Sequence, residues 1–174
     1  MPWDIDLAHT SAQFAAKHMG LAMIKGYFRK LSCTLEVDED NLEHSSVEAE
    51  VDVDSIDTNN ERRDNHLRSA DFFDVANHPK ITLKSRHLEP VKQDRYRLHA
   101  DLTIRGATRQ VAFDVTHLGT ITDQRGNRRI GFSVETTINR RDFGLPYSAA
   151  LPTNVLIAGD VVKISIEGEA IKRA

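Results

Sequence analysis

The side chains best placed to do acid–base chemistry are Asp64 and His66, which stand two positions apart. A carboxylate and an imidazole in contact would suit a hydrolase or an isomerase acting on a small apolar substrate. Thr58 is followed three residues later by Glu61, the pattern of a helix N-cap box, so residues 59–69 are expected to form a short helix. Residues two apart on a helix point in different directions. We therefore expect no catalytic residues, with an enzyme kept as the alternative.

The other reactive side chains lack the spacing of a known site. The 8 histidines show no HxH or HxxxH pairing, so no metal site is predicted. No GxSxG, Walker, GxGxxG or HExxH motif is present, so no cofactor is expected. Arg140 and Arg141 are the residues best suited to contact a phosphate headgroup. Cys33, the single cysteine, lies in an apolar alternation and is interpreted as a buried small hydrophobe rather than a nucleophile.

Length and composition indicate one globular domain over residues 1–174, with 40% hydrophobic and 28% charged residues. The formal net charge of -3 argues against a nucleic-acid-binding protein. No run approaches the roughly 18 apolar residues of a membrane span, and the N-terminus lacks the basic and apolar regions of a signal peptide. These features favour a cytoplasmic protein, with a periplasmic protein whose leader has been removed as the alternative.

Charge is unevenly distributed along the chain. Residues 36–57 hold ten acidic side chains and no Lys or Arg, whereas residues 80–109 hold eight basic and three acidic ones. We interpret the two segments as solvated faces of neighbouring strands that pair across a sheet. Transient recruitment to an anionic membrane surface is the alternative.

The elements that position these side chains are predicted to be strands, because apolar and polar residues alternate with a period of two. The alternation predicts eight strands, within residues 12–18, 28–37, 47–54, 81–86, 98–104, 111–116, 130–138 and 162–167. Turn chemistry at residues 105–108 and 123–127 makes successive strands antiparallel. The expected fold is all-β, an eight-stranded antiparallel up-and-down barrel with one short helix, and a sandwich is the alternative.

A barrel of eight strands has an interior that either is filled by side chains or holds one small ligand. Strands of eight to ten residues span about 26–33 Å, at about 3.3 Å per residue, which suits a long and thin apolar guest. The alternation, with the helix and the loop after it assumed to face inward, predicts a pore lined by Phe14, Phe28, Val51, Val53, Leu67, Phe72, Phe73, Ile81, Leu83, Leu102, Ile104, Phe113, Phe132, Ile138 and Ile164. A ligand-free structural barrel, dimeric through an exposed strand face, is the alternative.

Five segments of the chain, in this order, resemble the YceI-like family of polyisoprenoid-binding proteins: residues 3–20, 26–37, 55–85, 101–113 and 138–145. The resemblance covers nearly the whole chain. It implies a lipocalin-like barrel with a helix beside it and a hydrophobic pore for a polyisoprenoid or another long amphiphile. It implies no catalytic residues and no cofactor apart from a bound isoprenoid lipid.

One residue and one loop depart from the family pattern. Cys33 stands where many relatives have glycine, and the loop of residues 145–160, which would cap the mouth of the barrel, is richer in Ala, Leu and Pro. The side chains of Arg63 and Asp64 are interpreted as forming charge-assisted hydrogen bonds that hold the helix against the barrel.

The expected function is to bind a hydrophobic small molecule, such as an isoprenoid quinone, a polyprenyl phosphate or a fatty amide. Binding would serve transport, storage, sequestration or a stress response, with the polar headgroup near Arg140 or Arg141. No nucleic acid is expected as a partner, whereas a transient membrane contact and a homodimer both stay open.

Overall fold

The computed structural model describes residues 2–145 and 158–173. Eleven strands form its sheet. They are β1 (Pro2–Ile5), β2 (Ser11–His18), β3 (Met23–Phe28), β4 (Leu31–Glu36), β5 (Ser46–Asp52), β6 (Ile56–Asp57), β7 (Lys80–Lys92), β8 (Arg95–Ile104), β9 (Ala107–Thr122), β10 (Arg128–Asn139) and β11 (Ala158–Lys172). The helices of this part are α1 (Glu61–Arg68) and the short 3₁₀ turns η1 (Leu7–His9), η2 (Leu42–His44), η3 (Val53–Ser55) and η4 (Arg140–Phe143). Among the helices described, none is both long enough and apolar enough to cross a bilayer.

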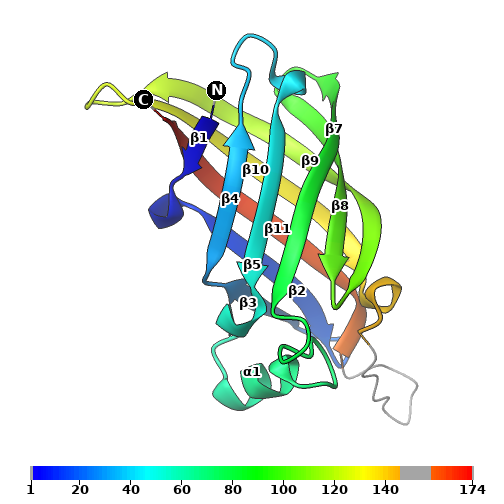
Figure 1. Cartoon of the computed structure of the whole chain (residues 1–174). Coiled ribbons are helices and arrows are strands. Elements are labelled where there is room, and N and C mark those ends of the chain that lie inside the picture. The colour runs from blue at the N-terminus through cyan, green and yellow to red at the C-terminus, as the bar shows by residue number, and fades with distance from the viewer. Residues whose placement is uncertain (1, 146–157, 174) are drawn as a thin grey trace.

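Eight of the strands close into a ring of antiparallel neighbours, in the order β1-β4-β5-β7-β8-β9-β10-β11 and back to β1. The other three strands extend this wall, because β11 pairs first with β2 and then, closer to its end, with β1. Figure 1 shows the resulting closed barrel, with α1 below one end and η2 above the other. The predicted eight-stranded barrel with one helix is confirmed, and the sandwich alternative is wrong.

The predicted turn after residue 104 is a two-residue hairpin between β8 and β9. Arg105 and Gly106 both have positive φ values, 49° and 74°, which match the right-handed twist of the two strands. Arg105 also donates from Nη1 to the carbonyl oxygens of Ala70 and Phe72, at 2.9 and 2.6 Å. The hairpin therefore ties the loop that follows α1 to the end of the barrel.

The acidic and basic segments of the sequence meet where β5 pairs with β7. Lys80 lies 3.5 Å from Glu50, and Lys84 lies 3.6 Å from Glu48. The register puts Glu48 opposite Lys84 and Asp52 opposite Lys80. The interpretation of these segments as paired strand faces is confirmed, although exposed pairs of this kind contribute little to stability.

Helix α1 begins later than the sequence indicated and has a different cap. Its N-cap is Asn60, whose side-chain oxygen accepts a hydrogen bond from the Arg63 N–H at 3.0 Å. The predicted cap box of Thr58 and Glu61 is therefore wrong. Thr58 is buried, and its N–H and hydroxyl both donate to the Asp64 carboxylate. This inward bond takes the Thr58 side chain away from the start of the helix.

The hydrophobic core is divided between the two ends of the barrel. Trp3, Val37, Ile130 and Ala170 form a cluster near η2, and Trp3 is only 1% exposed. A larger cluster centred on β8 and β9 extends toward the α1 end and includes Phe113. Between these packed regions the inward faces of the strands line an open space.

Candidate functional site: a cavity inside the barrel

The barrel encloses a cavity of about 360 Å³ with an almost wholly apolar wall. The wall runs from Ile5 and Leu42, toward the η2 end, to Leu67 and Phe73 at the α1 end. Its volume falls within the roughly 300–1,000 Å³ typical of ligand pockets. The cavity therefore has the size and lining of a site for one hydrophobic molecule.

The strand alternation explains both the apolar lining and the empty space. In β5 the side chains of Val47, Ala49 and Val51 face the cavity, whereas Glu48 faces outward and lies beside Lys84. Several inward positions hold small side chains that cannot reach the barrel axis: Ala12, Ala16, Cys33 and Ala49. Small residues on β2, β4 and β5 thus leave room that larger ones would fill.

Burial supports a hollow interior. Ala49, Ile81 and Leu83 face the cavity but are only half-buried, whereas Leu102 and Phe113, on the next two strands β8 and β9, are fully buried. In a filled barrel, inward side chains from every strand would lose nearly all of their accessible surface. The filled interior, expected of a ligand-free structural barrel, is thus not what the structure contains.

All the residues predicted to line the pore lie on the cavity wall except Val53. Val53 continues the alternation of β5 by two positions, but β5 ends at Asp52 and the chain turns into η3. The turn rotates Val53 off the wall, and its side chain is 1% exposed. The prediction for Val53 is therefore wrong.

Much of the cavity wall toward the η2 end was not predicted from the sequence. The same inward face continues there through Leu35, Val37, Val47, Leu88, Leu98, Val115 and Val134. Leu31 and Val162, nearer the α1 end, were missed as well. The signal was present, because these residues extend the alternation of strands that had been recognised. The prediction favoured large aromatic residues, which gather at the α1 end.

Aromatic rings from three elements narrow the α1 end of the cavity. The rings of Phe14 on β2 and Phe28 on β3 have centroids 5.4 Å apart, and Phe73, after α1, meets Phe28 edge-to-face at 6.1 Å. Such pairs favour tilted and edge-on contacts. The three rings form an apolar collar between the cavity and α1.

Arg140 is a buried cation at this end of the cavity wall, with a side chain 4% exposed. Its Nε donates to the Gly159 carbonyl at 3.1 Å, and its Nη1 donates to the Leu145 carbonyl at 3.3 Å. Its Nη2 lies 3.2 Å from the Asp160 carboxylate. Burial lowers the pKa of Arg140, and the nearby Asp160 charge opposes that shift. The guanidinium is held in a defined position by these carbonyls and one carboxylate.

Arg141, the other predicted headgroup residue, does not contribute to the wall. Its side chain is 56% exposed, and its Nε lies 2.9 Å from the same oxygen of Asp160. The 3₁₀ turn η4 sends adjacent residues in different directions, so only Arg140 reaches the cavity. The rest of the predicted capping loop, residues 146–157, lies outside the described residues.

Cys33 faces the cavity from the middle of β4. Burial raises the pKa of its thiol to about 11. A thiol in this state is a poor nucleophile at neutral pH. Cys33 therefore acts as a small apolar part of the wall, in a partly buried position.

Asp64 and His66 do not form an acid–base pair. Asp64 accepts hydrogen bonds from the Thr58 N–H at 2.9 Å and from the Thr58 hydroxyl, while Arg63 donates from Nε to that hydroxyl oxygen at 2.7 Å. His66 turns outward and lies 2.8 Å from Asp71. The expectation that the two side chains point apart is confirmed, and Arg63 and Asp64 both hold α1 to the segment before it.

Asp6, His9 and Glu169 are the group of potential metal ligands found within residues 2–145 and 158–173. Arg129 donates to Asp6 at 2.8 Å and lies 3.4 Å from Glu169. A guanidinium already neutralises these carboxylates, which gives the group a structural explanation.

Comparison with known proteins places the chain among bacterial relatives. The model of the YceI-like domain matches residues 3–170. A UPF0312 protein of Staphylococcus epidermidis is 33% identical over 168 residues, which cover 96% of this chain and 95% of that protein. A UPF0312 protein of Vibrio cholerae is 34% identical over 143 residues, covering 82% of this chain and 76% of that protein.

Solved structures show the same fold. Burkholderia cenocepacia BcnA superposes with a TM-score of 0.83 at 22% identity, covering 98% of this chain and 100% of that one. The Campylobacter jejuni YCEI protein superposes with a TM-score of 0.80 at 26% identity, covering 91% of this chain and 90% of that one. The third structure is a polyisoprenoid binding domain from Saccharophagus degradans, implicated in plant cell wall breakdown. It superposes with a TM-score of 0.69 at 14% identity, covering 99% of this chain and 98% of that one. With its barrel, its cavity and a domain match over nearly its whole length, the chain belongs to the YceI-like family.

Proposed function

We propose that the protein binds one long isoprenoid lipid inside the barrel and carries, stores or sequesters it without covalent change. The observation that carries this proposal is an apolar cavity that runs along the barrel from η2 to α1. An elongated apolar chain is the ligand shape that such a space accommodates best.

The energetics favour a prenyl chain. Each buried CH₂ contributes about 0.8 kcal/mol, so one five-carbon unit contributes about 4 kcal/mol before the cost of association. Affinity can then arise without a specific polar contact along the wall. The polyisoprenoid binding of the Saccharophagus degradans domain, which shares the fold, supports this class of ligand.

The headgroup is proposed to lie at the α1 end, beside Arg140. A phosphate or a quinone oxygen there would accept a charge-assisted hydrogen bond. Because its existing contacts already hold the guanidinium in place, Arg140 would need little reorganisation on binding.

A binding protein fits the site better than a hydrolase or an isomerase. Asp64 and His66, the candidate acid and base, do not line the cavity. The thiol of Cys33, which does, has a raised pKa. An enzyme would require a polar group poised to exchange protons at the substrate.

The test is native mass spectrometry of the purified protein, before and after adding ubiquinone or a polyprenyl phosphate, with solvent extraction of whatever is bound. We expect about one lipid per chain. Ala49→Phe, which places a ring in the middle of the cavity, should reduce uptake by about tenfold or more. Glu48→Phe puts the same ring on the outer face of β5 and should leave uptake unchanged. Absence of uptake by the unmodified protein, or equal uptake by the Ala49→Phe variant, would contradict the proposal.

A further inference from the structure

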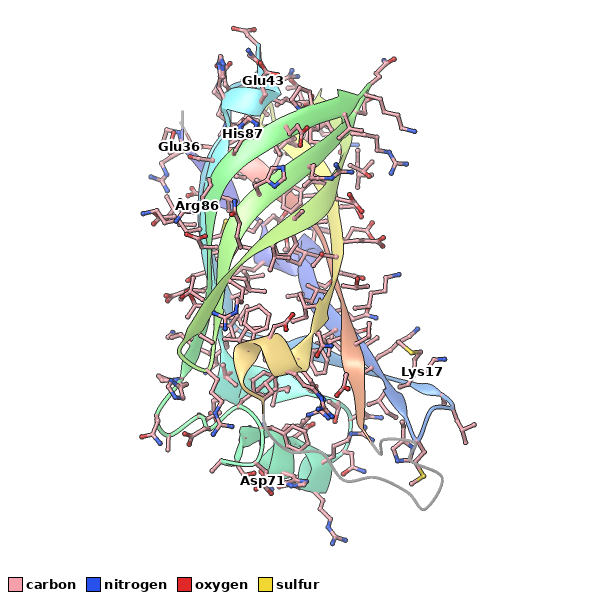
Figure 2. The ribbon with its side chains drawn as sticks, turned by 90° about the vertical axis from the view of Figure 1, so that its right-hand side faces the viewer. Lys17, Glu36, Glu43, Asp71, Arg86 and His87 are labelled. Atoms are coloured by element: carbon pink, nitrogen blue, oxygen red, sulfur yellow. The ribbon has the colours of Figure 1, made fainter. Side chains whose placement is uncertain are left out.

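The hairpin that joins β2 to β3 carries exposed apolar side chains that neither its packing nor its turn requires. Residues 17–23 are all exposed, and Met19, Leu21 and Met23 have exposed fractions of 36%, 77% and 43%. Figure 2 shows the hairpin, marked by Lys17, projecting from the barrel at the same end as α1, marked by Asp71. Three large apolar side chains on one projecting tip are unusual on a surface that meets only water.

The turn at the tip of this hairpin has a backbone conformation that does not favour methionine. Met19 and Gly20 both have positive φ values, 52° and 71°, and the Leu21 N–H donates to the His18 carbonyl at 2.9 Å. A turn of this kind favours Asn-Gly at its two central positions. Methionine is unfavourable in the left-handed region, so turn chemistry does not account for it. An exposed methionine at such a position indicates a contact with another surface.

The charges around the hairpin favour an anionic partner. Residues 7–35 contain no Asp or Glu but include Lys17, Lys25, Arg29 and Lys30. Arg29 is paired with Asp57 at 3.2 Å. Lys17 and Lys25 are exposed, and neither has an ion-pair partner among the residues that the structure describes. The register sets Lys17 directly opposite Met23, so positive charge borders the apolar tip.

The opposite end of the barrel carries charges of both signs. Figure 2 shows Glu36 and Glu43 near η2, and the segment between them adds Asp38, Glu39 and Asp40. Glu39 pairs there with Arg128 and Lys172, at 2.7 and 2.8 Å, so the charge of this end is partly balanced. An anionic surface would be attracted instead to Lys17 and Lys25 of the hairpin. The two ends of the barrel therefore differ in how they would approach an anionic bilayer.

The hairpin is also continuous with the ligand cavity. Strand β2 contributes Phe14 and Ala16 to the wall, and Ala16 pairs with Val162, another wall residue. Arg140, at the α1 end of the same wall, donates to Gly159, where an added Cβ would meet the Lys17 backbone at 3.5 Å. A surface that held the hairpin would thus lie next to the α1 end of the cavity.

We propose that residues 17–25 dock on an anionic phospholipid bilayer, with Met19, Leu21 and Met23 among the acyl chains and Lys17 and Lys25 at the phosphates. Apolar residues flanked by lysines are the arrangement that binds at such an interface. The inference rests on the proposed function, for which docking would supply the route by which a membrane lipid enters or leaves the cavity.

The experiment is flotation of the full chain with vesicles of 70% phosphatidylcholine and 30% phosphatidylglycerol, compared with vesicles of phosphatidylcholine alone. We expect binding to the anionic vesicles that weakens as salt is added. The variant Met19→Asn/Leu21→Ser/Met23→Ser should lose about tenfold or more in binding, since each buried apolar group contributes to membrane affinity. Met19→Asn also installs the residue that the turn prefers, so the hairpin is expected to fold. Lys17→Glu/Lys25→Glu should abolish the preference for anionic vesicles.

The matched control is Val91→Ser/Leu118→Ser/Ile121→Ser, which removes three apolar side chains of similar exposure, 52%, 54% and 60%, toward the η2 end. It should bind vesicles like the unmodified protein. The proposal is overturned if the unmodified protein does not float, if both triple variants bind equally, or if the control alone loses binding. It is also overturned if the hairpin variant only converts a dimer to a monomer in sedimentation, because the tip would then join two copies of the chain.

Uptake of ubiquinone from detergent separates this proposal from the proposed function. The hairpin variant should still take up the lipid from detergent, and lose only its uptake from vesicles. Vesicle binding without any lipid uptake would contradict the carrier function but leave the docking surface in place.

Discussion

A Cβ atom on Gly26 would overlap the ring of Phe14, whose Cε1 would lie only 2.6 Å away. Gly26 on β3 and Phe14 on β2 are directly opposite each other in the sheet. The absence of a side chain at residue 26 lets the phenyl ring lie flat across the strand and contribute to the aromatic collar at the α1 end.

Gly26→Ala should therefore displace Phe14 and destabilise the protein by about 1–3 kcal/mol, the usual cost of overpacking. Denaturant unfolding followed by the fluorescence of Trp3, the single tryptophan, measures the change. Gly131→Ala is the control, since its new Cβ would meet Leu118 at 3.4 Å, an ordinary contact. Equal stability of the two variants would mean that Phe14 has no fixed position.

Arg140→Met should remove the preference of the cavity for an anionic headgroup. The unmodified protein is expected to bind a polyprenyl phosphate more tightly than the matching alcohol by about tenfold, because a hydrogen bond to a charged group contributes about 1.5–3 kcal/mol. The ratio of the two dissociation constants measures this preference. Asp160 keeps Arg141 as a partner at 2.9 Å, so the fold should survive. Arg141→Met should leave this ratio unchanged. If the Arg141→Met variant instead lost the preference for the phosphate, the headgroup would lie beside Arg141 and not beside Arg140.

Cys33 should react slowly with iodoacetamide, and more slowly still when a lipid is bound. With a pKa of about 11, the thiol is deprotonated in about one molecule per thousand at pH 8, roughly a hundredfold less than in the unfolded chain. The rate, followed by mass spectrometry, should rise about tenfold for each pH unit until near the pKa. A rate that does not change on loading with ubiquinone would place the ligand away from β4.

Asp64→Ala should loosen α1 from the barrel. The substitution leaves the Thr58 N–H without its acceptor in a buried position, at a cost of about 1–3 kcal/mol. Hydrogen exchange should speed up in residues 58–73, and thermal stability should fall. Asp71→Ala removes a carboxylate that pairs with His66 at the exposed surface, and should change both quantities little. Similar effects from the two substitutions would contradict a structural role for the Thr58–Asp64 bond.

Arg129→Met should change how stability depends on acid. Hydrogen bonds from Arg129 are the main cause that holds the pKa values of Asp6 and Asp123 below the ordinary 3.8. A carboxylate with a lowered pKa stabilises the fold above its unfolded pKa, and this contribution is lost as the pH falls through the folded pKa. The variant should be less stable at pH 7 and lose less stability between about pH 4 and pH 2. Unfolding midpoints measured across that pH range test this prediction. Arg125→Met, in the turn that also holds Asp123, is the control.

Local patterns accounted for most of the barrel. The alternation around Ala49 and around Leu102 correctly predicted which side chains face inward, because side-chain direction in a strand depends only on position along it. Strand β1, by contrast, is four residues long and has too few positions to show a pattern. It exists because Trp3 pairs with Leu35 on β4 and with Lys172 on β11, two segments far away in the sequence.

Period-two alternation was enough to predict the fold class and the apolar character of the interior, and helix geometry was enough to separate His66 from Asp64. Three features became visible only in the folded barrel: Arg140 and not Arg141 reaches the cavity, Val53 leaves the wall, and small residues on neighbouring strands leave a hollow. Alternation is a local property of the backbone. A cavity, in contrast, depends on which side chains meet across the barrel, and closure of the ring sets those meetings.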